Sequence, residues 1–275
     1  MFNLKSERKN TMHSVSSINT GALVAGNYAA KSQREFSKSI ARLSTGKRAM
    51  YGADPAGQGI ADSLNANSRS WKVAARNAED GISAAQLAES SLIEIAALAT
   101  RLRELGIQAD NASMLSTSDI SALDAEAEAI YDAIDAIIET TKFNGVDLLG
   151  FSVKSHAVAV ADDGGSIHLK TSNGFTSVSD HNEAAGAEVT ADIVLSEVST
   201  DLGNVAAGMA AFKARQAVAY SASSNLAAAA SRIADTDFAA ESANLARMSI
   251  LNQSAMAMVA QANKATGAFL TIINQ

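Results

Sequence analysis

Apolar and small residues recur with spacings of three and four at both ends of the chain. Such spacing places them on one face of an α-helix and is typical of a helix that packs along another helix. We call the two series the N-terminal seam and the C-terminal seam. The N-terminal seam is Val15, Ile18, Ala22, Ala25, Ala29, Ser32, Phe36, Ser39 and Leu43, and the C-terminal seam is Leu245, Met248, Asn252, Ala255, Val259, Ala262, Thr266, Phe269 and Ile273. The terminal stretches are therefore predicted to pair with each other and with further copies of the chain.

The same spacing predicts three further helices, at about residues 60–110, 119–141 and 195–233. Glycine and proline between Ser44 and Gly57 predict a connector before the first of them. Ser118 or Asp119 is expected to cap the second helix, which should end at Lys142-Phe143-Asn144-Gly145.

The middle of the chain has a different pattern. Residues 151–160 alternate between polar and apolar, Asp162-Asp163-Gly164-Gly165 marks a turn, and Ile167 and Leu169 resume the alternation. This predicts a β-hairpin, and the polar run that follows to Gly186 predicts an exposed loop. The expected fold is mainly α: an elongated antiparallel coiled-coil rod formed by both chain halves, with a small β-hairpin insert. In the insert, Ser155, Thr171 and Ser177 are expected to be the principal glycan carriers.

Composition narrows the classes of partner. The chain has 22 Lys plus Arg against 29 Asp plus Glu, a net charge of −7, which argues against nucleic acid as a partner. There is no cysteine, so disulfides and thiolate metal sites are excluded. No stretch reaches the roughly 18 apolar residues of a membrane span. The terminal helices carry charges of both signs, so no membrane partner is expected.

The first residues could be mistaken for a secretion signal. Lys5, Arg8 and Lys9 could form its basic region, but the apolar run that follows is shorter than the roughly 7–15 residues required. No cleaved signal peptide is therefore expected. Residues 1–11 lie outside the N-terminal seam, so they are either a disordered tail or an upstream start, with Met12 the true beginning.

Candidate catalytic sets are missing from the sequence. The histidines are His13, His156, His168 and His181, and they form neither an HExxH motif nor a pair at helical spacing. No GxSxG motif and no phosphate-binding GxxxxGK[ST] loop occurs. We therefore expect no enzyme activity, no cofactor and no metal site.

The seams contain many Ala, Ser and Thr residues, which limits the stability of the terminal helices. A buried methyl group contributes far less than the roughly 1.5–3 kcal/mol of a buried Leu or Phe, and isolated helices gain most of their stability from packing. One interpretation is an antiparallel bundle with frayed ends. The interpretation we favour is a subunit whose termini become ordered in a polymer, because the apolar pattern continues almost to Gln275.

Several stretches resemble conserved motifs of bacterial flagellin. In chain order they are Arg42-Leu43-Ser44-Thr45-Gly46-Lys47-Arg48, Ala53-Asp54-Pro55-Ala56-Gly57, Asn77-Ala78-Glu79-Asp80-Gly81-Ile82-Ser83, Arg101-Leu102-Arg103-Glu104-Leu105, Thr141-Lys142-Phe143-Asn144-Gly145, Arg232-Ile233-Ala234-Asp235-Thr236-Asp237-Phe238 and Met258-Val259-Ala260-Gln261-Ala262-Asn263. The resemblance covers about residues 12–150 and 195–273, with the motifs in the family's order.

This resemblance implies a structural subunit that is exported and self-assembles into the helical filament of the bacterial flagellum for swimming motility. The implied location is the extracellular filament. The implied partners are copies of itself, an export chaperone, the flagellar type III export apparatus, the filament cap and the hook–filament junction proteins. A hook–filament junction protein, which shares flagellin-like ends, remains the alternative.

The resemblance also divides the chain into segments. Residues 12–48 and 237–275 would be the helices of the filament core, and both seams would lie within it. Residues 49–150 and 192–236 would form the two halves of the helical rod, and residues 151–191 the exposed central region.

In the flagellin family, a vertebrate Toll-like receptor reads an arginine and a leucine in the Arg-Glu-Leu block and a glutamate on the next helix. Arg101 and Leu105 match that pattern, and Glu126 matches if one residue is inserted near Met114. We expect packing within the rod to be the primary role of these three residues.

A charge in the C-terminal seam should block assembly. Val259→Asp and Phe269→Asp are each expected to abolish polymerisation, because a carboxylate cannot be buried against a neighbouring helix without a partner. The central helices should keep their circular dichroism signal. Normal filaments from both variants, seen by electron microscopy, would contradict a role for the seam in assembly.

Overall fold

The computed structural model describes residues 19–48, 54–177 and 183–273, without the side chains of residues 269, 270, 272 and 273. The chain divides into two compact units. The central unit is Ser63–Ala228, and the terminal unit consists of Met1–Asp62 with Ala229–Gln275. Each unit is described by itself.

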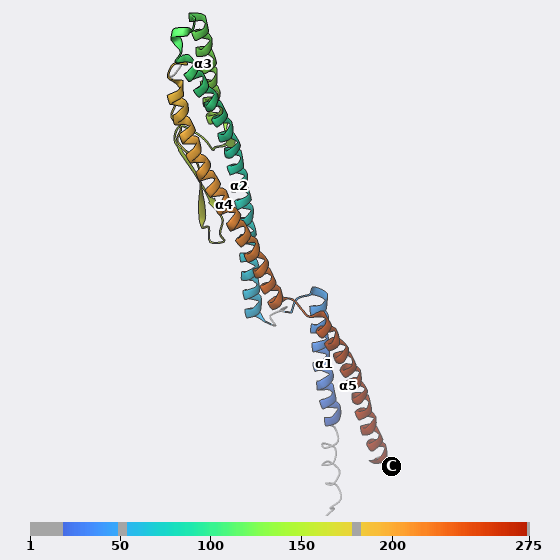
Figure 1. Cartoon of the computed structure of the whole chain (residues 1–275). Coiled ribbons are helices and arrows are strands. Elements are labelled where there is room, and N and C mark those ends of the chain that lie inside the picture. The colour runs from blue at the N-terminus through green and yellow to red at the C-terminus, as the bar shows by residue number, and fades with distance from the viewer. Residues whose placement is uncertain (1–18, 49–53, 178–182, 274–275) are drawn as a thin grey trace, which may run out of the picture. The chain divides into compact units, whose positions relative to one another are not determined.

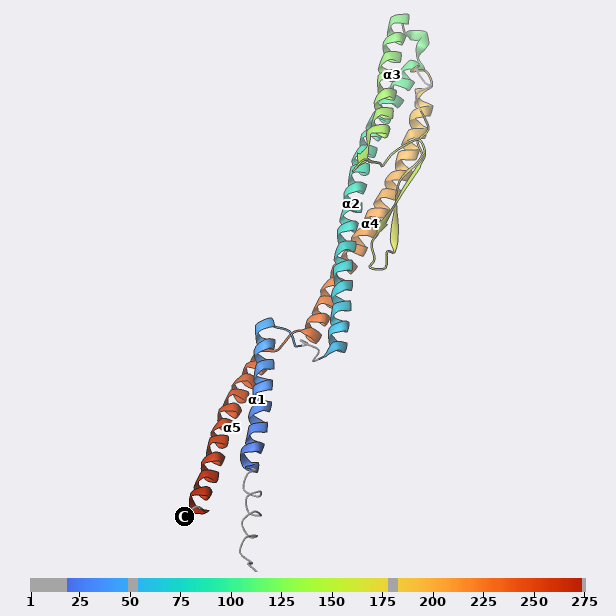
Figure 2. The ribbon, with the colours of Figure 1, turned by 180° about the vertical axis from the view of Figure 1, so that it is seen from behind.

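Three helices make the body of the central unit: α2 (Pro55–Ala109), α3 (Thr117–Thr140) and α4 (Ala187–Ala234). Both α3 and α4 run antiparallel to α2 (Figures 1 and 2). The polar contacts agree with this direction, since Arg101 of α2 bonds Glu126 of α3, and Arg103 of α2 bonds Asp192 of α4. A 3-10 turn, Ala112–Met114, lies between α2 and α3.

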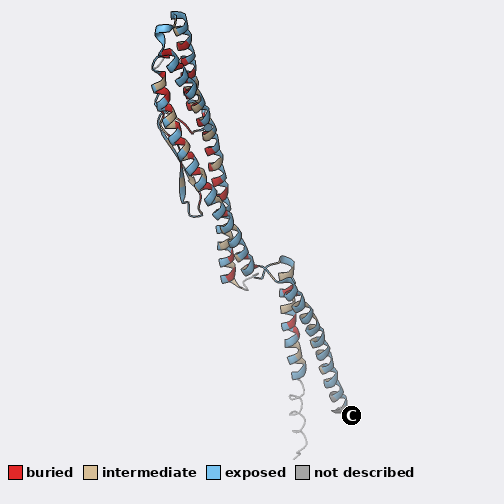
Figure 3. Ribbon diagram, viewed as in Figure 1, coloured by how far each residue is buried: buried red, intermediate tan, exposed pale blue. Residues whose placement is uncertain are grey.

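Leucine, isoleucine, valine, phenylalanine and alanine side chains on the facing sides of these helices form one core (Figure 3). Its largest fully buried members are Phe212, Leu92, Ile95, Leu102, Leu105, Ile134, Ile138, Leu149, Leu169, Val194 and Val198. Those on α2, α3 and α4 recur at the helical spacings that predicted the helices, because one face of each helix is withdrawn from water. Leu149 and Leu169 lie outside the helices. The prediction of a mainly helical fold with antiparallel packing and a small β insert is confirmed.

All three helix starts that the helical spacing suggested were placed too late, and α4 begins at Ala187 rather than near residue 195. Helix α2 begins at Pro55, about five residues before the expected position, because proline suits the first helical turn. The Asp54 carboxylate accepts the Gly57 N–H at 2.8 Å there. Helix α3 is capped by Ser116 rather than by Ser118 or Asp119. Ser116 and Asp119 bond each other's backbone N–H groups in a capping box.

A small hairpin after α3 was missed. Strands β1 (Lys142–Phe143) and β2 (Val146–Asp147) pair around Asn144 and Gly145. Both turn residues have positive φ, 50° and 79°, the conformation that an Asn-Gly turn favours. The sequence signal was present, but it was taken only as the end of the helix.

The predicted larger hairpin is formed by β3 (Val153–Ala159) and β4 (Ser166–Asn173), which pair antiparallel. It lies along α4 (Figures 1 and 2). Leu169 is fully buried, and its side chain closely approaches Gly208 of α4. Thr171 is fully buried as well, and its hydroxyl donates to Leu148 O, so the expectation that Thr171 carries a glycan is wrong.

The end of β4 is anchored by a buried carboxylate of α4. Asp201 is only 1% exposed and accepts hydrogen bonds from the backbone N–H and the side-chain amide of Asn173. Burial raises the pKa of Asp201, while these hydrogen bonds oppose the rise. Just beyond, Phe175 is buried, and farther along Ala184 is buried too. The segment predicted as an exposed loop is therefore docked on the helices at these two points.

Two helices form most of the terminal unit: α1 (Thr20–Thr45) and α5 (Phe238–Ile273). They run antiparallel, with Asn19 bonded to Asn263 near one end and Arg42 bonded to Glu241 near the other. Asn19 also caps α1, since its side chain accepts the Ala22 N–H. Gly46, at φ 68°, ends α1 in the left-handed conformation that glycine adopts most easily.

Helix α2 contains a stretch more apolar than we expected from the sequence. An 18-residue window of α2 has a mean hydropathy of 1.3, which passes a length-and-composition test for a membrane span. The expectation that no stretch would qualify is wrong by this measure, because alanine-rich segments with few charges also score as apolar. Within the protein, the buried residues of α2, among them Leu92 and Ile95, face α3 and α4.

Gly106 gives a test of the helix packing. A Cβ atom at Gly106 would lie 2.4 Å from the backbone nitrogen of Glu188, at the start of α4. Gly106→Ala should therefore destabilise the chain by about 1–3 kcal/mol, although an exposed helix would gain up to about 1 kcal/mol from alanine.

The matched control is Gly203→Ala, because nothing lies within 4 Å of a Cβ at that position. Thermal unfolding followed by circular dichroism gives both values. Equal melting temperatures for the two variants would contradict the prediction, because they would show that the backbone at the start of α4 moves to make room for the methyl group at position 106.

Candidate assembly surface

The terminal helices meet along their small-residue faces. In α1, Ala29, Ser32 and Ser39 are buried, and Ala22, Ala25, Phe36 and Leu43 are half-buried. In α5, the half-buried positions include Leu245, Met248, Asn252, Ala255, Val259, Ala262 and Thr266. These are the described members of the two predicted seams. Val15 and Ile18, and the side chains of Phe269 and Ile273, lie outside the described residues.

Large apolar side chains are left on the outer faces of the same helices. Leu23 of α1 is 60% exposed and Tyr28 is 63% exposed, while Ile250 of α5 is 64% exposed and Met258 is 62% exposed. On one side of the pair a groove of about 580 Å³ is lined by Val24, Ala25, Tyr28, Leu251, Ala255 and Met258, among others. A soluble helix pair would normally place polar residues at such positions, so these faces are candidates for contact with another chain.

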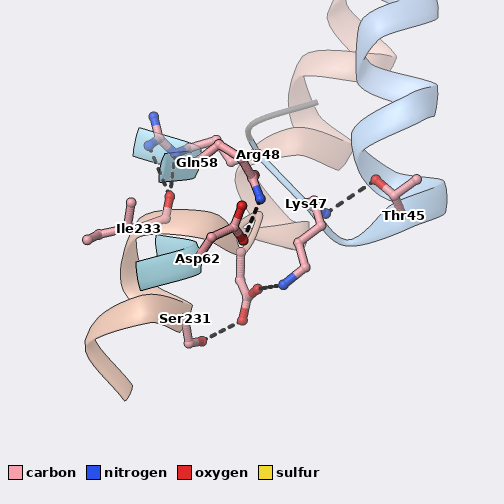
Figure 4. A network of polar contacts seen from close by, with 8 residues as sticks. Thr45, Lys47, Arg48, Gln58, Asp62, Ser231 and Ile233 are labelled. Atoms are coloured by element: carbon pink, nitrogen blue, oxygen red, sulfur yellow. Dashed lines mark hydrogen bonds and ion pairs between the residues drawn. The ribbon is translucent and has the colours of Figure 1, made fainter. Parts of the chain in front are cut away.

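A polar clasp joins the end of α1 to the connector between α4 and α5 (Figure 4). The Lys47 ammonium donates to Asp235 at 2.8 Å, and the Arg48 guanidinium donates to the carbonyl oxygen of Ile233 at 3.0 and 3.1 Å. Two backbone bonds run beside them, from the Arg48 N–H to Ala234 O and from the Thr236 N–H to Gly46 O. The Arg48 guanidinium also donates to the Asp54 carboxylate at 3.0 Å. Two sequence motifs that lie about 190 residues apart therefore meet, and we define the clasp as residues 46–48, 54 and 231–236.

The carboxylates of the clasp are held in their charged form. Hydrogen bonds from Lys47 and Ser231 lower the pKa of Asp235 below its usual value of 3.8. The backbone N–H of Gly57, and then the Arg48 side chain, lower the pKa of Asp54 in the same way. Both carboxylates are accessible to solvent, so each ion pair adds little to the stability of the clasp. The connector is held by several hydrogen bonds together.

Arg101, Leu105 and Glu126 are brought to one place. The Arg101 guanidinium donates to Glu126 Oε1 at 2.8 and 2.5 Å and to Glu104 at 3.2 Å. Leu105 is fully buried in the core beneath. Arg101 and Glu126 are thus a surface ion pair between α2 and α3, and Leu105 is a packing residue.

Sites for chemistry are absent from the described part of the chain. Over residues 19–48, 54–177 and 183–273, no group of three or more His, Asp or Glu residues could hold a metal ion. His156 lines an open groove of about 600 Å³ between the β3–β4 hairpin and α2, and His168 is exposed on β4. His13 and His181 lie outside the described residues.

The arrangement of paired termini and a helical central unit has counterparts among known proteins. The bacterial flagellin N-terminal helical region matches residues 17–153, and the bacterial flagellin C-terminal helical region matches residues 190–272. A flagellin of Halalkalibacterium halodurans is 33% identical over 248 residues, which are 86% of this chain and 91% of that protein. The chain belongs to the bacterial flagellin family.

Other relatives differ in length. A flagellin of Bacillus subtilis is 28% identical over 295 aligned positions, covering 92% of this chain and 95% of that protein. A flagellin of Xenorhabdus nematophila is 40% identical over 161 residues, but these are only 51% of that protein. The crystal structure of Bacillus cereus flagellin aligns over 55% of this chain and 88% of that one, with 24% identity and a TM-score of 0.36.

Membership of this family settles the general function. The chain is a structural subunit that is exported and self-assembles into the extracellular filament of the bacterial flagellum, and it is not an enzyme. The relatives described above are named flagellin, which gives no support to the junction-protein alternative.

The clasp should make the filament sensitive to acid. Asp235 has a lowered folded-state pKa, so its stabilising effect is present above its usual pKa of 3.8 and is lost as the pH falls through the lowered value. Filaments of the Asp235→Asn variant should therefore dissociate at a lower urea concentration than wild-type filaments at neutral pH. This difference should close well below pH 3.8.

Light scattering during urea titration gives the dissociation midpoints. The control is Asp132→Asn on the exposed face of α3, which should leave the midpoint unchanged at every pH. If the dissociation midpoints of wild-type and Asp235→Asn filaments still differ at the lowest pH, an ionic role for Asp235 is contradicted.

Proposed function

We propose that α1 and α5 form the inner core of the flagellar filament and that the two seams hold this core together. The observation that carries the proposal is the outer face of the helix pair, where Leu23, Tyr28, Ile250 and Met258 are each about three-fifths exposed. Neighbouring subunits in a helical array supply the apolar surface that would remove these side chains from water.

The small seam residues serve the same role from inside the pair. Ala22, Ala25 and Ala29 let the two helix backbones approach closely, but they withdraw little apolar area from water. The pair therefore gains stability chiefly when further copies cover its outer faces. The free subunit should have weakly ordered termini, and the polymer should order them.

The remaining segments take their roles from this arrangement. We assign residues 12–48 and 237–275 to the filament core, and residues 49–150 and 192–236 to the surrounding helical layer. Residues 151–191, which contain the β3–β4 hairpin, form the outward region.

Partners of the family are proposed for this chain on the same basis. They are an export chaperone, the flagellar type III export apparatus, the filament cap and the hook–filament junction proteins. Export through that apparatus would leave the subunit without a cleaved signal peptide, and the short apolar run after Lys9 supports this. The intact mass of the subunit from purified filaments tests it.

We propose rod packing as the primary role of Arg101, Leu105 and Glu126. A Toll-like receptor would meet Arg101 already bonded to Glu126, with Leu105 beneath the surface. Recognition by such a receptor would therefore require Arg101 to exchange one carboxylate partner for another.

Electron microscopy after seeded or salt-induced polymerisation tests the proposed function. The full chain should give long tubular filaments, because both terminal helices are present to supply the core. A chain without residues 12–48 and 237–275 should stay monomeric, while its circular dichroism still reports the central helices.

Filaments from the truncated chain would show that the central unit alone drives assembly. A full chain that remains monomeric under all conditions would make a junction protein the better assignment.

A further inference from the structure

The facing surfaces of α1 and α5 do not define their own register. In the half of α1 that begins at Thr20, the seam positions are Ala22, Ala25, Ala29 and Ser32, and three of these four are alanine. Sliding α5 by one heptad, about 10.5 Å along the axis, would bring Leu245 and Met248, or Ala262 and Thr266, opposite these residues, whose small side chains would admit either set. Apolar packing therefore gives little preference for one register over the next in this half of the pair.

One polar residue in this seam distinguishes the registers. The Asn252 side chain is half-buried and donates from Nδ2 to Ala29 O at 3.3 Å and to Gln33 Oε1 at 3.1 Å. A backbone carbonyl of α1 is available in every register, but a side-chain acceptor is not. Moving α5 by one heptad would bring Gly26 or Ile40 to the place of Gln33. Neither residue has a side-chain atom that can accept the amide hydrogen bond.

The polar contacts at the two ends of the pair also favour the observed register. Arg42 bonds Glu241 at 3.4 Å, and Glu241 is only 7% exposed. A shift of one heptad in one direction would place Glu241 against Glu35. Asn19 bonds Asn263 at the other end, but these two residues are exposed to solvent, where a hydrogen bond discriminates least.

We propose that Asn252, through Gln33, is a positioning residue for the register of the α1–α5 pair, acting together with the Arg42–Glu241 contact and with the clasp at the end of α1. A polar residue at a seam position is known to specify register in coiled coils at some cost in stability. The inference rests on the proposed function, because it matters for assembly only if the α1–α5 pair forms the filament core. A single register would give every subunit the same outer face, which a helical array requires.

Engineered disulfides can report the register, because the chain has no cysteine of its own. A Cβ at position 21 would lie 3.8 Å from the Cβ of Ala262, within the range of a disulfide. Gly21→Cys with Ala262→Cys therefore reports the native register. Gly21→Cys with Ala255→Cys, and Tyr28→Cys with Ala262→Cys, report shifts of one heptad in the two directions.

Each pair is tested in filaments of the full chain, oxidised after assembly and analysed by peptide mass spectrometry for links within one subunit. In the otherwise unchanged chain, only the native reporter should link efficiently. Asn252→Leu should keep the helices packed and raise the yield of the shifted reporters by about threefold to tenfold, the range that one net hydrogen bond supports.

The matched control is Gln253→Leu, which places the same apolar side chain at the neighbouring exposed position and should leave all yields unchanged. Exchanging the amide pair, with Asn252→Gln and Gln33→Asn together, should restore the native preference. If Asn252→Leu filaments link only in the native register, the proposal is overturned.

If the Asn252→Leu chain alone forms no filaments, it is instead copolymerised with an excess of the unsubstituted chain. If the variant is excluded from such mixed filaments, Asn252 is required for packing rather than for register, which also overturns the proposal.

A different result bears on the proposed function. If filaments of the otherwise unchanged chain give no link within the subunit at the native reporter, α1 and α5 do not pair in the core.

Discussion

Close approach of helices through small side chains is the constraint on which this molecule depends. Alanine and serine at the α1–α5 seam let two backbones come together, yet they withdraw too little apolar area from water to hold the pair firmly. The large apolar residues are instead on the outside, at Leu23, Tyr28, Ile250 and Met258. The central unit has the opposite distribution, with Leu92, Ile95, Ile134 and Phe212 buried inside it. The central unit thus has a core of large side chains within a single chain, whereas we propose that the terminal unit is completed by its neighbours.

The clasp between residues 46–48 and 231–236 shows how the chain turns from α4 into α5 through the short connector Asp235-Thr236-Asp237. Gly46 supplies the left-handed backbone, and the bonds of Lys47 and Arg48 satisfy a carboxylate and a carbonyl of the connector after α4. These are the residues that carry the family resemblance at both ends of the chain. Their similarity to flagellin thus has a structural explanation, because the two motifs bond to each other.

Helical periodicity was enough to predict the fold class and the buried faces of the helices, since it reports directly which side of a helix avoids water. It could not place the ends of helices, which depend on single bonds such as Ser116 with Asp119 and Asp54 with Gly57. It also could not show that Thr171 is buried, because a threonine on a strand is equally compatible with either face. The sequence did not predict that Arg101 bonds Glu126, because a family pattern only grouped them as possible receptor contacts, whereas the antiparallel packing of α2 and α3 brings the two residues together. The role of Asn252 gave no sequence signal beyond its place in the seam.

The antiparallel pairing of α1 with α5 also has a consequence for the order of folding. Asn19 meets Asn263, which lies 244 positions farther along the chain, while α2 and α3 are joined by a short turn and Arg101 meets Glu126 only 25 positions away. Contacts between residues near in sequence form quickly, and those that close a long loop form late. If the chain is exported with its N-terminus first, it can therefore complete its α2–α3 contacts while α5 is still in transit. The terminal pair closes only when the last helix has been delivered, so subunit maturation is coupled to the completion of its own transport.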